Sequence, residues 1–262
     1  MSPSSSRRGT MDLTILEKHD DSGSTNWWVL GRVRLFRKLF SASSLTERPA
    51  VLEIGPGAGS NLSIWDKNSS TVVVADADDL ALQLSLKYEP SGAVLLDASS
   101  LPFNDESFDH VLLGDVLEHL VNDLGAMKEV LRVLKPTGMA VVTVPAYQFL
   151  WGEQDRLAGH QRRYRLRSLR QMLLDCGYEI EHIGYFNWVL FPFAAVFKLT
   201  MRFLKPRKYS DATTIPRALN SILKRIFRAD VAIARHLSIP FGISIMAVLS
   251  KPQPNGVKKG VG

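Results

Sequence analysis

The chain has 262 residues, enough to bury one substantial hydrophobic core, and sheet–helix folds of this length are commonly single domains. Its net charge of +6 is uneven, because residues 1–150 carry 13 basic and 19 acidic side chains whereas residues 151–262 carry 19 and 7. Its single cysteine, Cys176, excludes an internal disulfide and favours a reducing compartment, so we expect a cytoplasmic protein, with peripheral membrane association as the alternative.

The first 49 residues come before any strand-like pattern. Residues 1–10 are rich in Ser and Arg and show no signal peptide, so a disordered tail is expected there. Trp27, Trp28 and the segment Val33-Arg-Leu-Phe-Arg-Lys-Leu-Phe40 predict one or two amphipathic helices. We expect residues 1–49 to form a tail and helices on the substrate side, with core packing of the two tryptophans as the alternative.

The stretch Val51-Leu-Glu-Ile-Gly-Pro-Gly-Ala-Gly59 predicts a buried strand that runs into a glycine turn. Its glycines let the backbone fold tightly and approach a ligand closely. The next apolar run, 71–75, ends at Asp76, whose two carboxylate oxygens suit a ribose diol. Together they predict a nucleoside pocket at the C-terminal edge of a parallel sheet. The G-x-G-x-G spacing differs from that of NAD sites, because Ser60 stands where a third glycine is needed.

Three further segments follow in order: Val94-Leu-Leu-Asp97-Ala98, the strand-like His110-Val-Leu-Leu-Gly114, and the helix-like Asp115-Val-Leu-Glu-His-Leu120. In order and spacing, these motifs resemble the class I S-adenosylmethionine-dependent methyltransferases, particularly their broad small-molecule group. The resemblance covers roughly residues 48–183 and a closing strand near 242–250.

Apolar runs that alternate with helical patterns predict an α/β fold with a parallel sheet. The expected strands are 50–54, 71–75, 93–96, 108–113, 138–144, 178–185 and 242–250, with helical spacing over 80–88 and 123–134. We expect Lys135-Pro-Thr-Gly138 to stop the second helix. The resemblance implies a Rossmann-like seven-stranded sheet of order 3-2-1-4-5-7-6, with helices on both faces and the seventh strand antiparallel. The core would then comprise residues 50–185 and 242–252.

Residues 186–241 form an α-helical insertion between the sixth and seventh strands. The apolar run 185–197 is well short of the ~20 residues that cross a bilayer. Three interpretations stay open: residues 186–208 lie on a membrane surface, the insertion is a lid over an apolar substrate, or it forms a homodimer contact. The basic half of the chain could meet nucleic acid, anionic lipid or a phosphorylated substrate, or be a solvated face. Gly114-Asp115-Val116-Leu117 stands where base-amine methyltransferases can carry N-P-P-[YF], which argues against methylation of base amines but leaves nucleic-acid binding by the basic half open.

The resemblance implies that the chain binds S-adenosylmethionine and releases S-adenosylhomocysteine. Its expected contacts are the glycine loop with Glu53, the ribose acid Asp76, the adenine contacts Asp97 and Ala98, and the Gly114 carbonyl facing the ammonium; the loop glycines are Gly55, Gly57 and Gly59. For Glu53, Asp76 and Asp97 the alternative is a purely structural acid at a strand end.

The acceptor side is predicted from two segments. Asp115, Glu118 and His119 have i, i+3, i+4 spacing, which predicts one helical face. That face could serve packing, hold His119 as a base, or bind a metal, as a similar pattern does in some quinone-pathway methyltransferases.

The second segment, from Trp151 to Tyr164, resembles the W-x-x-x-D…H-x-R-R-Y stretch of some small-molecule methyltransferases and predicts a loop over the acceptor. Tyr147 and His160 join His119 as catalytic candidates. The substrate-binding candidates are Trp151, Arg162, Arg163 and Tyr164. The alternative for the arginines is pairing with acids at the sheet edge.

Methyl transfer from a sulfonium needs held geometry and excluded water, and a base only when the acceptor must lose a proton. We therefore expect methylation of O, N or C of a small hydrophobic acceptor. The alternatives are a lipid-soluble acceptor such as a quinone, isoprenoid or lipid-linked sugar at a membrane surface, or an RNA-binding methyltransferase.

Overall fold

The computed structural model describes residues 26–41, 47–204, 217–234 and 239–252. The expected tail, residues 1–10, and the basic end of the 186–208 segment, residues 205–208, lie outside the described residues.

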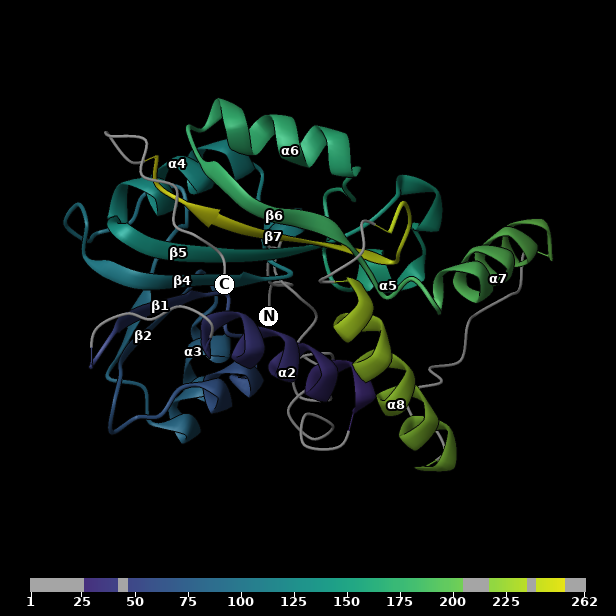
Figure 1. The fold of residues 1–262 in the computed structure, drawn as a ribbon, viewed down its shortest axis with the longest axis horizontal. Helices are drawn as coiled ribbons and strands as arrows, with labels where there is room; N and C mark the ends of the chain where they lie inside the picture. The colour runs from purple at the N-terminus through teal and green to yellow at the C-terminus, as the bar shows by residue number, and fades with distance from the viewer. Residues whose placement is uncertain (1–25, 42–46, 205–216, 235–238, 253–262) are drawn as a thin grey trace, which may run out of the picture.

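A seven-stranded sheet of order β3-β2-β1-β4-β5-β7-β6 forms the centre of the molecule (Figure 1). Its strands are β1 (Ala50–Ile54), β2 (Thr71–Asp76), β3 (Gly92–Leu95), β4 (Phe108–Gly114), β5 (Leu134–Pro145), β6 (Glu179–Phe186) and β7 (Ser244–Ser250). Strand β7 pairs antiparallel with β5 and β6, and the other neighbours pair in parallel. The predicted fold class and strand order are confirmed. The order places the carboxyl ends of β1 to β5 along one edge, where ligands bind in such sheets.

The start of β5 differs from the prediction. Helix α4 (Asp123–Val133) ends before Lys135, and β5 already begins at Leu134, which pairs with Phe108. The side chain of Leu134 is fully buried, so core packing draws this residue into the sheet before the proline is reached. The helix thus ends within one residue of the expected position, but the Lys135-Pro-Thr-Gly138 stretch already belongs to β5, with a register shift opposite it.

Helices cover both faces of the sheet (Figure 1). On one face, α4 and α6 (Leu166–Asp175) contribute to the largest hydrophobic cluster. On the other face lie α2 (Trp27–Ser41), α3 (Asp79–Ser85) and α8 (Arg217–Ala234). The cap of α3 is Asp78, whose carboxylate accepts the backbone N–H of Leu80, and Asn122 caps α4 in the same way.

The segment before the first strand forms one helix, α2, that belongs to the core. Phe36 is fully buried in a cluster with residues of β4, β5 and β7. Trp28 stacks on Phe186 with ring centroids 6.0 Å apart, and Trp27 meets Phe227 of α8 edge-on at 5.9 Å. The two tryptophans thus pack against the core, which matches the alternative prediction and not the substrate-side one.

The insertion after β6 divides into two unlike parts. Helix α8 joins the core, because Phe227 is only 1% exposed. Its ring packs so closely on Gly31 of α2 that a Cβ added to this glycine would lie 2.5 Å from the ring. The buried carboxylate of Asp230 accepts the backbone N–H groups of residues 187–189 and so ties α8 to the end of β6.

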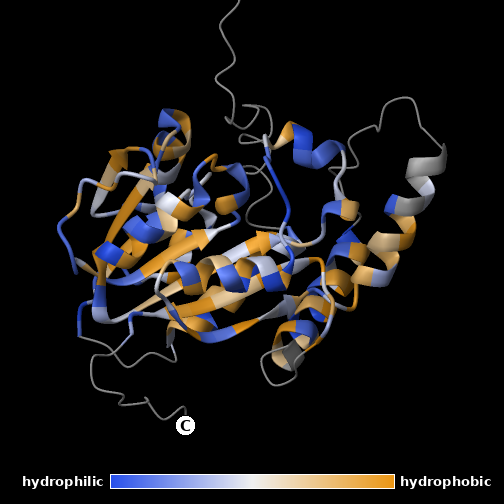
Figure 2. Cartoon of the chain, turned by 90° about the horizontal axis from the view of Figure 1, so that it is seen from above, coloured by the Kyte–Doolittle hydropathy of each residue, from blue (hydrophilic) through white to orange (hydrophobic). Residues whose placement is uncertain are grey.

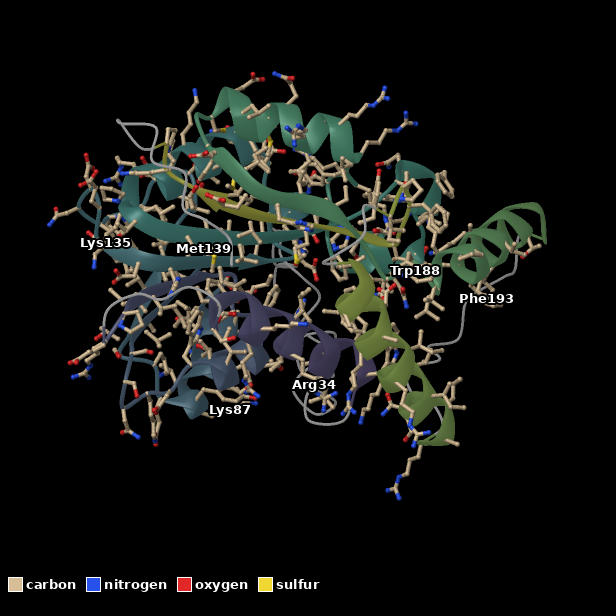
Figure 3. All side chains as sticks on the ribbon, in the orientation of Figure 1. Arg34, Lys87, Lys135, Met139, Trp188 and Phe193 are labelled. Atoms are coloured by element: carbon tan, nitrogen blue, oxygen red, sulfur yellow. The ribbon has the colours of Figure 1, made fainter. Side chains whose placement is uncertain are left out.

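Helix α7 (Phe191–Leu204) projects from the body (Figures 1 and 2). Phe193 and Val196 are 72% and 62% exposed on it, and Figure 3 places Phe193 away from the sheet. Within the part of the chain that is described, no helix is both long and apolar enough to span a bilayer.

Candidate functional site

The glycine loop after β1 has the conformation that its sequence predicts. Gly55, Gly57 and Gly59 have φ angles of 69°, 54° and 81°, in the left-handed region that residues with a Cβ rarely adopt. A Cβ on Gly59 would lie 2.6 Å from the ring of Tyr88, whereas a Cβ on Gly57 would meet nothing within 4 Å. The loop therefore packs on one side and leaves open space at Gly57, where a ligand could approach the backbone.

Glu53, near the end of β1, has a fully buried carboxylate at the base of this loop. Its Oε1 accepts a hydrogen bond of 3.0 Å from Asn61 Nδ2, and its Oε2 has no hydrogen-bond partner among the described residues. Burial raises the pKa of Glu53 to about 7, against the opposing effect of Asn61. Because an unsatisfied buried acceptor costs about 1–3 kcal/mol, the site suits a ligand that brings a donor or a positive charge.

Asp76 ends β2 beside the same loop. Its Oδ1 accepts the backbone N–H of Asp78 at 3.0 Å, and the backbone N–H of Gly57 also interacts with the carboxylate. Burial raises the pKa of Asp76 to about 6. The loop and the strand end are tied together, since Gly55 N donates to Ala75 O at 2.8 Å. Both acids thus lie at one sheet edge, as expected.

The remaining cofactor candidates follow at the ends of β3 and β4. Asp97 is exposed, and its Oδ1 accepts the backbone N–H and the hydroxyl of Ser99 at 2.8 and 2.7 Å, which lowers its pKa. Ala98 beside it is buried. Gly114 ends β4, and a Cβ there would come within 3.4 Å of Asn61 Nδ2, the group that holds Glu53. The structure brings these residues to one edge; their cofactor contacts stay predictions.

Asp115 does not lie on a helical face with Glu118 and His119, so that prediction is wrong. Its φ of 59° is left-handed, and its N–H donates to Thr143 O at 3.0 Å, which prolongs the β4–β5 ladder by one residue. Only a single 3₁₀ turn, η3 (Leu117–His119), follows. The sheet ladder outcompetes helix formation here because the strand pairing continues past Gly114.

The carboxylate of Asp115 is instead held by two other elements. Its Oδ2 pairs with Arg32 Nη1 of α2 at 2.7 Å, and its Oδ1 accepts the hydroxyl of Thr143 at 3.0 Å. Arg32 was missed by the sequence analysis. The available signal was its position four residues before Phe36, on the apolar face of an amphipathic helix, where a cation needs an acidic partner.

The two predicted histidines meet although they are far apart in sequence. The rings of His119 and His160 lie edge-to-face with centroids 4.7 Å apart. His160 Nδ1 lies 2.9 Å from Asp155 Oδ1, and its Nε2 lies 3.9 Å from Glu118 Oε1. Burial, followed by the nearby His160, lowers the pKa of His119 to about 4, so its imidazole is neutral at physiological pH and is a weak base.

Two acids anchor this region. Burial, reinforced by the charge of Asp115, raises the pKa of Glu118 well above its ordinary value. Burial would also raise the pKa of Asp155, but hydrogen bonds from His160 and Arg163 outweigh it and lower the pKa to about 2. Asp155 is thus ionised and Glu118 sits in a site that disfavours an uncompensated negative charge.

The predicted substrate-binding residues of the 151–164 loop have internal partners. Arg163 donates from Nε and Nη2 to both oxygens of Asp155 at 2.7 and 3.1 Å, and Arg162 Nη1 pairs with Asp123 Oδ2 at 2.9 Å. The buried Tyr164 hydroxyl donates to the same Asp123 oxygen at 2.7 Å. These contacts match the alternative in which the arginines stabilise the fold; contact with a substrate stays a prediction.

An aromatic cluster gathers around Tyr147 at the carboxyl end of β5. Tyr147 stacks on Tyr185 of β6 at 5.2 Å and contacts Phe149 and Phe191 at 5.4 Å, and Phe191 meets Phe241 at 5.3 Å. Burial and the Tyr185 hydroxyl raise the pKa of Tyr147, so this phenol stays protonated and is not suited to act as a base.

Trp151, the other aromatic candidate of this region, lies edge-on to His160 at 6.5 Å. The loop thus joins the aromatic cluster on one side and the histidine pair on the other, and its role as an acceptor cover stays a prediction.

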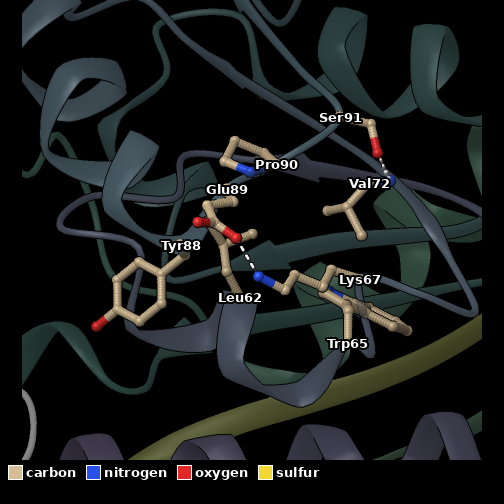
Figure 4. A pocket seen from close by; sticks show the side chains of 8 residues that line it. All are labelled: Leu62, Trp65, Lys67, Val72, Tyr88, Glu89, Pro90 and Ser91. Atoms are coloured by element: carbon tan, nitrogen blue, oxygen red, sulfur yellow. Dashed lines mark hydrogen bonds and ion pairs between the residues drawn. The ribbon is translucent and has the colours of Figure 1, made fainter.

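A small pocket elsewhere does not belong to this site (Figure 4). It is lined by Leu62, Trp65, Lys67, Val72, Tyr88, Glu89, Pro90 and Ser91, with Lys67 and Glu89 forming an ion pair across it. Val72 is the second residue of β2 and Asp76 the last, so the pocket lies toward the opposite end of that strand from Asp76.

Comparison with known proteins finds methyltransferase relatives for much of the chain. A family model described as a methyltransferase domain matches residues 52–142. A Mycobacterium tuberculosis protein described as a probable S-adenosylmethionine-dependent methyltransferase is 26% identical over 191 residues, covering 71% of this chain and 69% of the relative. The demethylmenaquinone methyltransferase of Staphylococcus epidermidis is 53% identical, but over only 45 residues, 17% of this chain and 19% of that protein.

Solved structures share the fold at low identity. The [4+2]-cyclase SpnF has a TM-score of 0.57 at 19% identity, covering 84% of this chain and 80% of its own. A Haemonchus contortus phosphoethanolamine N-methyltransferase, solved with S-adenosyl-L-methionine, has a TM-score of 0.56 at 18% identity, covering 84% of this chain and 52% of its own.

The residues present also fit the cofactor of that class. The open approach at Gly57 and the unpartnered buried oxygen of Glu53 lie near Asp76 at the carboxyl ends of the neighbouring parallel strands β1 and β2. The strand order, the matched domain and this edge of the sheet agree in supporting a class I S-adenosylmethionine-dependent methyltransferase.

Proposed function

We propose that the enzyme methylates O, N or C of a small hydrophobic acceptor that binds at the aromatic cluster around Tyr147. The observation that carries this proposal is the concentration of aromatic rings at the carboxyl ends of β5 and β6, the edge of the sheet at which β4 also ends with Gly114. Phe149 and Phe241 are 45% and 36% exposed there, so their rings offer apolar area to a ligand.

The chemistry asks the protein mainly for positioning. When bound, S-adenosylmethionine supplies an electrophilic methyl group on a sulfonium, and the carbon–sulfur electron pair returns to sulfur. The acceptor lone pair forms the new bond to carbon. If the acceptor atom carries a proton, an imidazole of the His119 and His160 pair is the candidate base. Arg163 and Asp155 hold His160 and thereby the wall of the site, which favours a fixed geometry and excluded water.

A homologous series tests the acceptor class. We would assay 4-alkylphenols and alkylamines of increasing chain length, following methyl transfer and, in the presence of S-adenosylhomocysteine, the shift in melting temperature. Each buried methylene should raise kcat/KM about fourfold, since it contributes about 0.8 kcal/mol. Phe149→Ala should flatten that dependence, while Phe193→Ala on the projecting helix serves as the control. No gain with chain length in either series would refute a hydrophobic acceptor site.

A second candidate is action at a membrane surface on a lipid-soluble acceptor. Its support is the exposed apolar side chains of α7 and the basic face of α8, where Arg217, Arg225 and Arg228 are exposed. Apolar residues beside cations suit the interface of an anionic bilayer. The long apolar side chains of both helices that are exposed are Phe193, Val196, Phe197, Leu219 and Ile222.

Flotation with vesicles that contain anionic lipid tests this candidate. The double variant of Phe193→Ser and Val196→Ser should lose most vesicle binding. A matched control, Leu95→Ser with Val121→Ser, changes two equally exposed apolar residues elsewhere and should bind as the wild type does. Equal flotation of the two double variants would remove the membrane proposal and leave the methyltransferase activity untouched.

A further inference from the structure

Three potential metal ligands converge between two separate segments of the chain. Glu118 and His119 come from the 3₁₀ turn after β4, and His160 follows α5 (Glu153–Leu157). One ligand atom from each residue lies within 4.8 Å of the others. The set combines one carboxylate with two imidazoles, which is a common donor set for zinc and related divalent ions.

The carboxylate of Glu118 is buried without a donor. The residue is 0% exposed, and neither Oε1 nor Oε2 has a hydrogen-bond partner among the described residues. The neighbouring cations are engaged elsewhere, because Arg32 pairs with Asp115 and Arg163 pairs with Asp155. Each of those pairs is neutral, so a negative charge on Glu118 would have no compensating partner among the described residues of this cluster. A buried charge in that position is costly unless a cation or a proton joins it.

His160 turns a lone pair toward this carboxylate. The Asp155 carboxylate, which both Nε and Nη2 of Arg163 contact, accepts from Nδ1 at 2.9 Å, so in the neutral ring the Nδ1 carries the hydrogen and Nε2 is an acceptor. Nε2 lies 3.9 Å from Glu118 Oε1, too far for a hydrogen bond. Two acceptors therefore face each other across a gap. Asp155 is itself held by Arg163, and a carboxylate that orients a histidine in this way is typical of metal ligands.

We propose that Glu118, His119 and His160 bind one divalent transition-metal ion of the zinc type. Ligand atoms about 2.0–2.1 Å from a tetrahedral ion lie about 3.4 Å apart, so binding draws the group together by roughly an ångström. Two nitrogen ligands favour such an ion over Mg²⁺, which prefers oxygen. Asp115 is not a ligand, because Arg32 and Thr143 hold its carboxylate.

The site would join the turn after β4 to the loop after β5. Three protein ligands leave a coordination position open in a four-coordinate ion. Resting on the proposed function, that position would take an oxygen of the acceptor and favour its deprotonated form, with the proton released to solvent, because His119 as a metal ligand would not also serve as the base. Binding of the ion itself does not depend on the acceptor, so it can be tested without turnover.

The experiment uses the full chain after removal of metal by a chelator. Co²⁺ is titrated while its visible d–d absorption is followed, then displaced with Zn²⁺, and Mg²⁺ is titrated as a weak-binding comparison. We expect one Co²⁺ per chain with the absorption of a tetrahedral site. Glu118→Gln and His160→Asn should each weaken Co²⁺ binding at least tenfold.

The matched control is His182→Asn, which removes an imidazole from β6 outside the cluster and should leave Co²⁺ binding unchanged. Binding of S-adenosylmethionine, measured by calorimetry, shows whether each variant is folded. This measurement does not depend on whether the variant binds Co²⁺. The proposal is overturned if the wild type takes up no stoichiometric Co²⁺, if the two cluster variants bind it as the wild type does, or if His182→Asn weakens it equally. Loss of acceptor turnover with intact metal binding would count against the proposed function alone.

Discussion

Asp76 provides the sharpest test of the cofactor site. Removing its charge should stabilise the ligand-free protein but weaken the binding of S-adenosylmethionine. Burial raises its pKa from the ordinary 3.8 to about 6 in the ligand-free protein. At 1.36 kcal/mol for each pH unit, the ionised carboxylate costs about 3 kcal/mol of folding free energy near neutral pH. The enzyme keeps this unfavourable charge at the edge where we predict the ribose hydroxyls.

Asp76→Asn keeps the shape of the side chain and an acceptor for the Asp78 backbone N–H, but removes the charge. The ligand-free variant should therefore be more stable than the wild type near neutral pH, by up to about 3 kcal/mol. For an acid with a raised pKa the wild-type cost is present above about 6 and absent below 3.8. The advantage of the variant should thus shrink as pH falls through that window.

S-adenosylmethionine binding should change in the other direction. Loss of a charged acceptor for two hydroxyls costs about 1–3 kcal/mol, or roughly fivefold to 150-fold in Kd. Denaturant unfolding at several pH values measures the first effect and calorimetry the second. Asp79→Asn, an equal charge change on an exposed neighbour, is the control. A variant less stable than the wild type at neutral pH, or one that binds the cofactor equally well, would refute the argument.

Three further substitutions test other parts of the fold and site. Asp230→Ala leaves the backbone N–H groups of 187–189 without their acceptor, so unfolding free energy should fall by about 2–5 kcal/mol, and a loss under 1 kcal/mol would contradict the anchoring role of α8. Gly59→Ala strains a φ of 81° and places a Cβ 2.6 Å from the Tyr88 ring, so stability should fall by about 1–3 kcal/mol with weaker cofactor binding; an unchanged melting temperature would show that the loop relaxes freely. Tyr164→Phe removes a hydrogen bond to Asp123 and should cost about 1.5–3 kcal/mol in denaturant unfolding with acceptor KM unchanged, whereas a raised KM without loss of stability would place the hydroxyl on the acceptor.

Features set by near neighbours in the chain could be predicted from the sequence. The glycine spacing after Val51 predicts the left-handed loop, because only residues without a Cβ adopt those angles cheaply, and all three glycines adopt them. The acids that end apolar runs predict the site edge, because parallel strands bring their carboxyl ends together, and Glu53, Asp76 and Asp97 lie along it. The order of the strands came from family resemblance, since periodicity carries no information about which strands pair.

Features set by contacts between distant segments needed the tertiary structure. The left-handed Asp115 arises because its N–H completes the ladder with Thr143, a partner that helical spacing does not reveal. The partnership of Glu118 with His160 depends on how the loop after β5 folds back over the turn after β4. The different roles of α7 and α8 within the insertion likewise follow from tertiary contacts. Phe227 of α8 packs against α2 at Gly31, where there is no Cβ to block the ring. Local pattern fixes backbone conformation through sterics, but which side chains meet is decided by packing and by the need to satisfy buried charge.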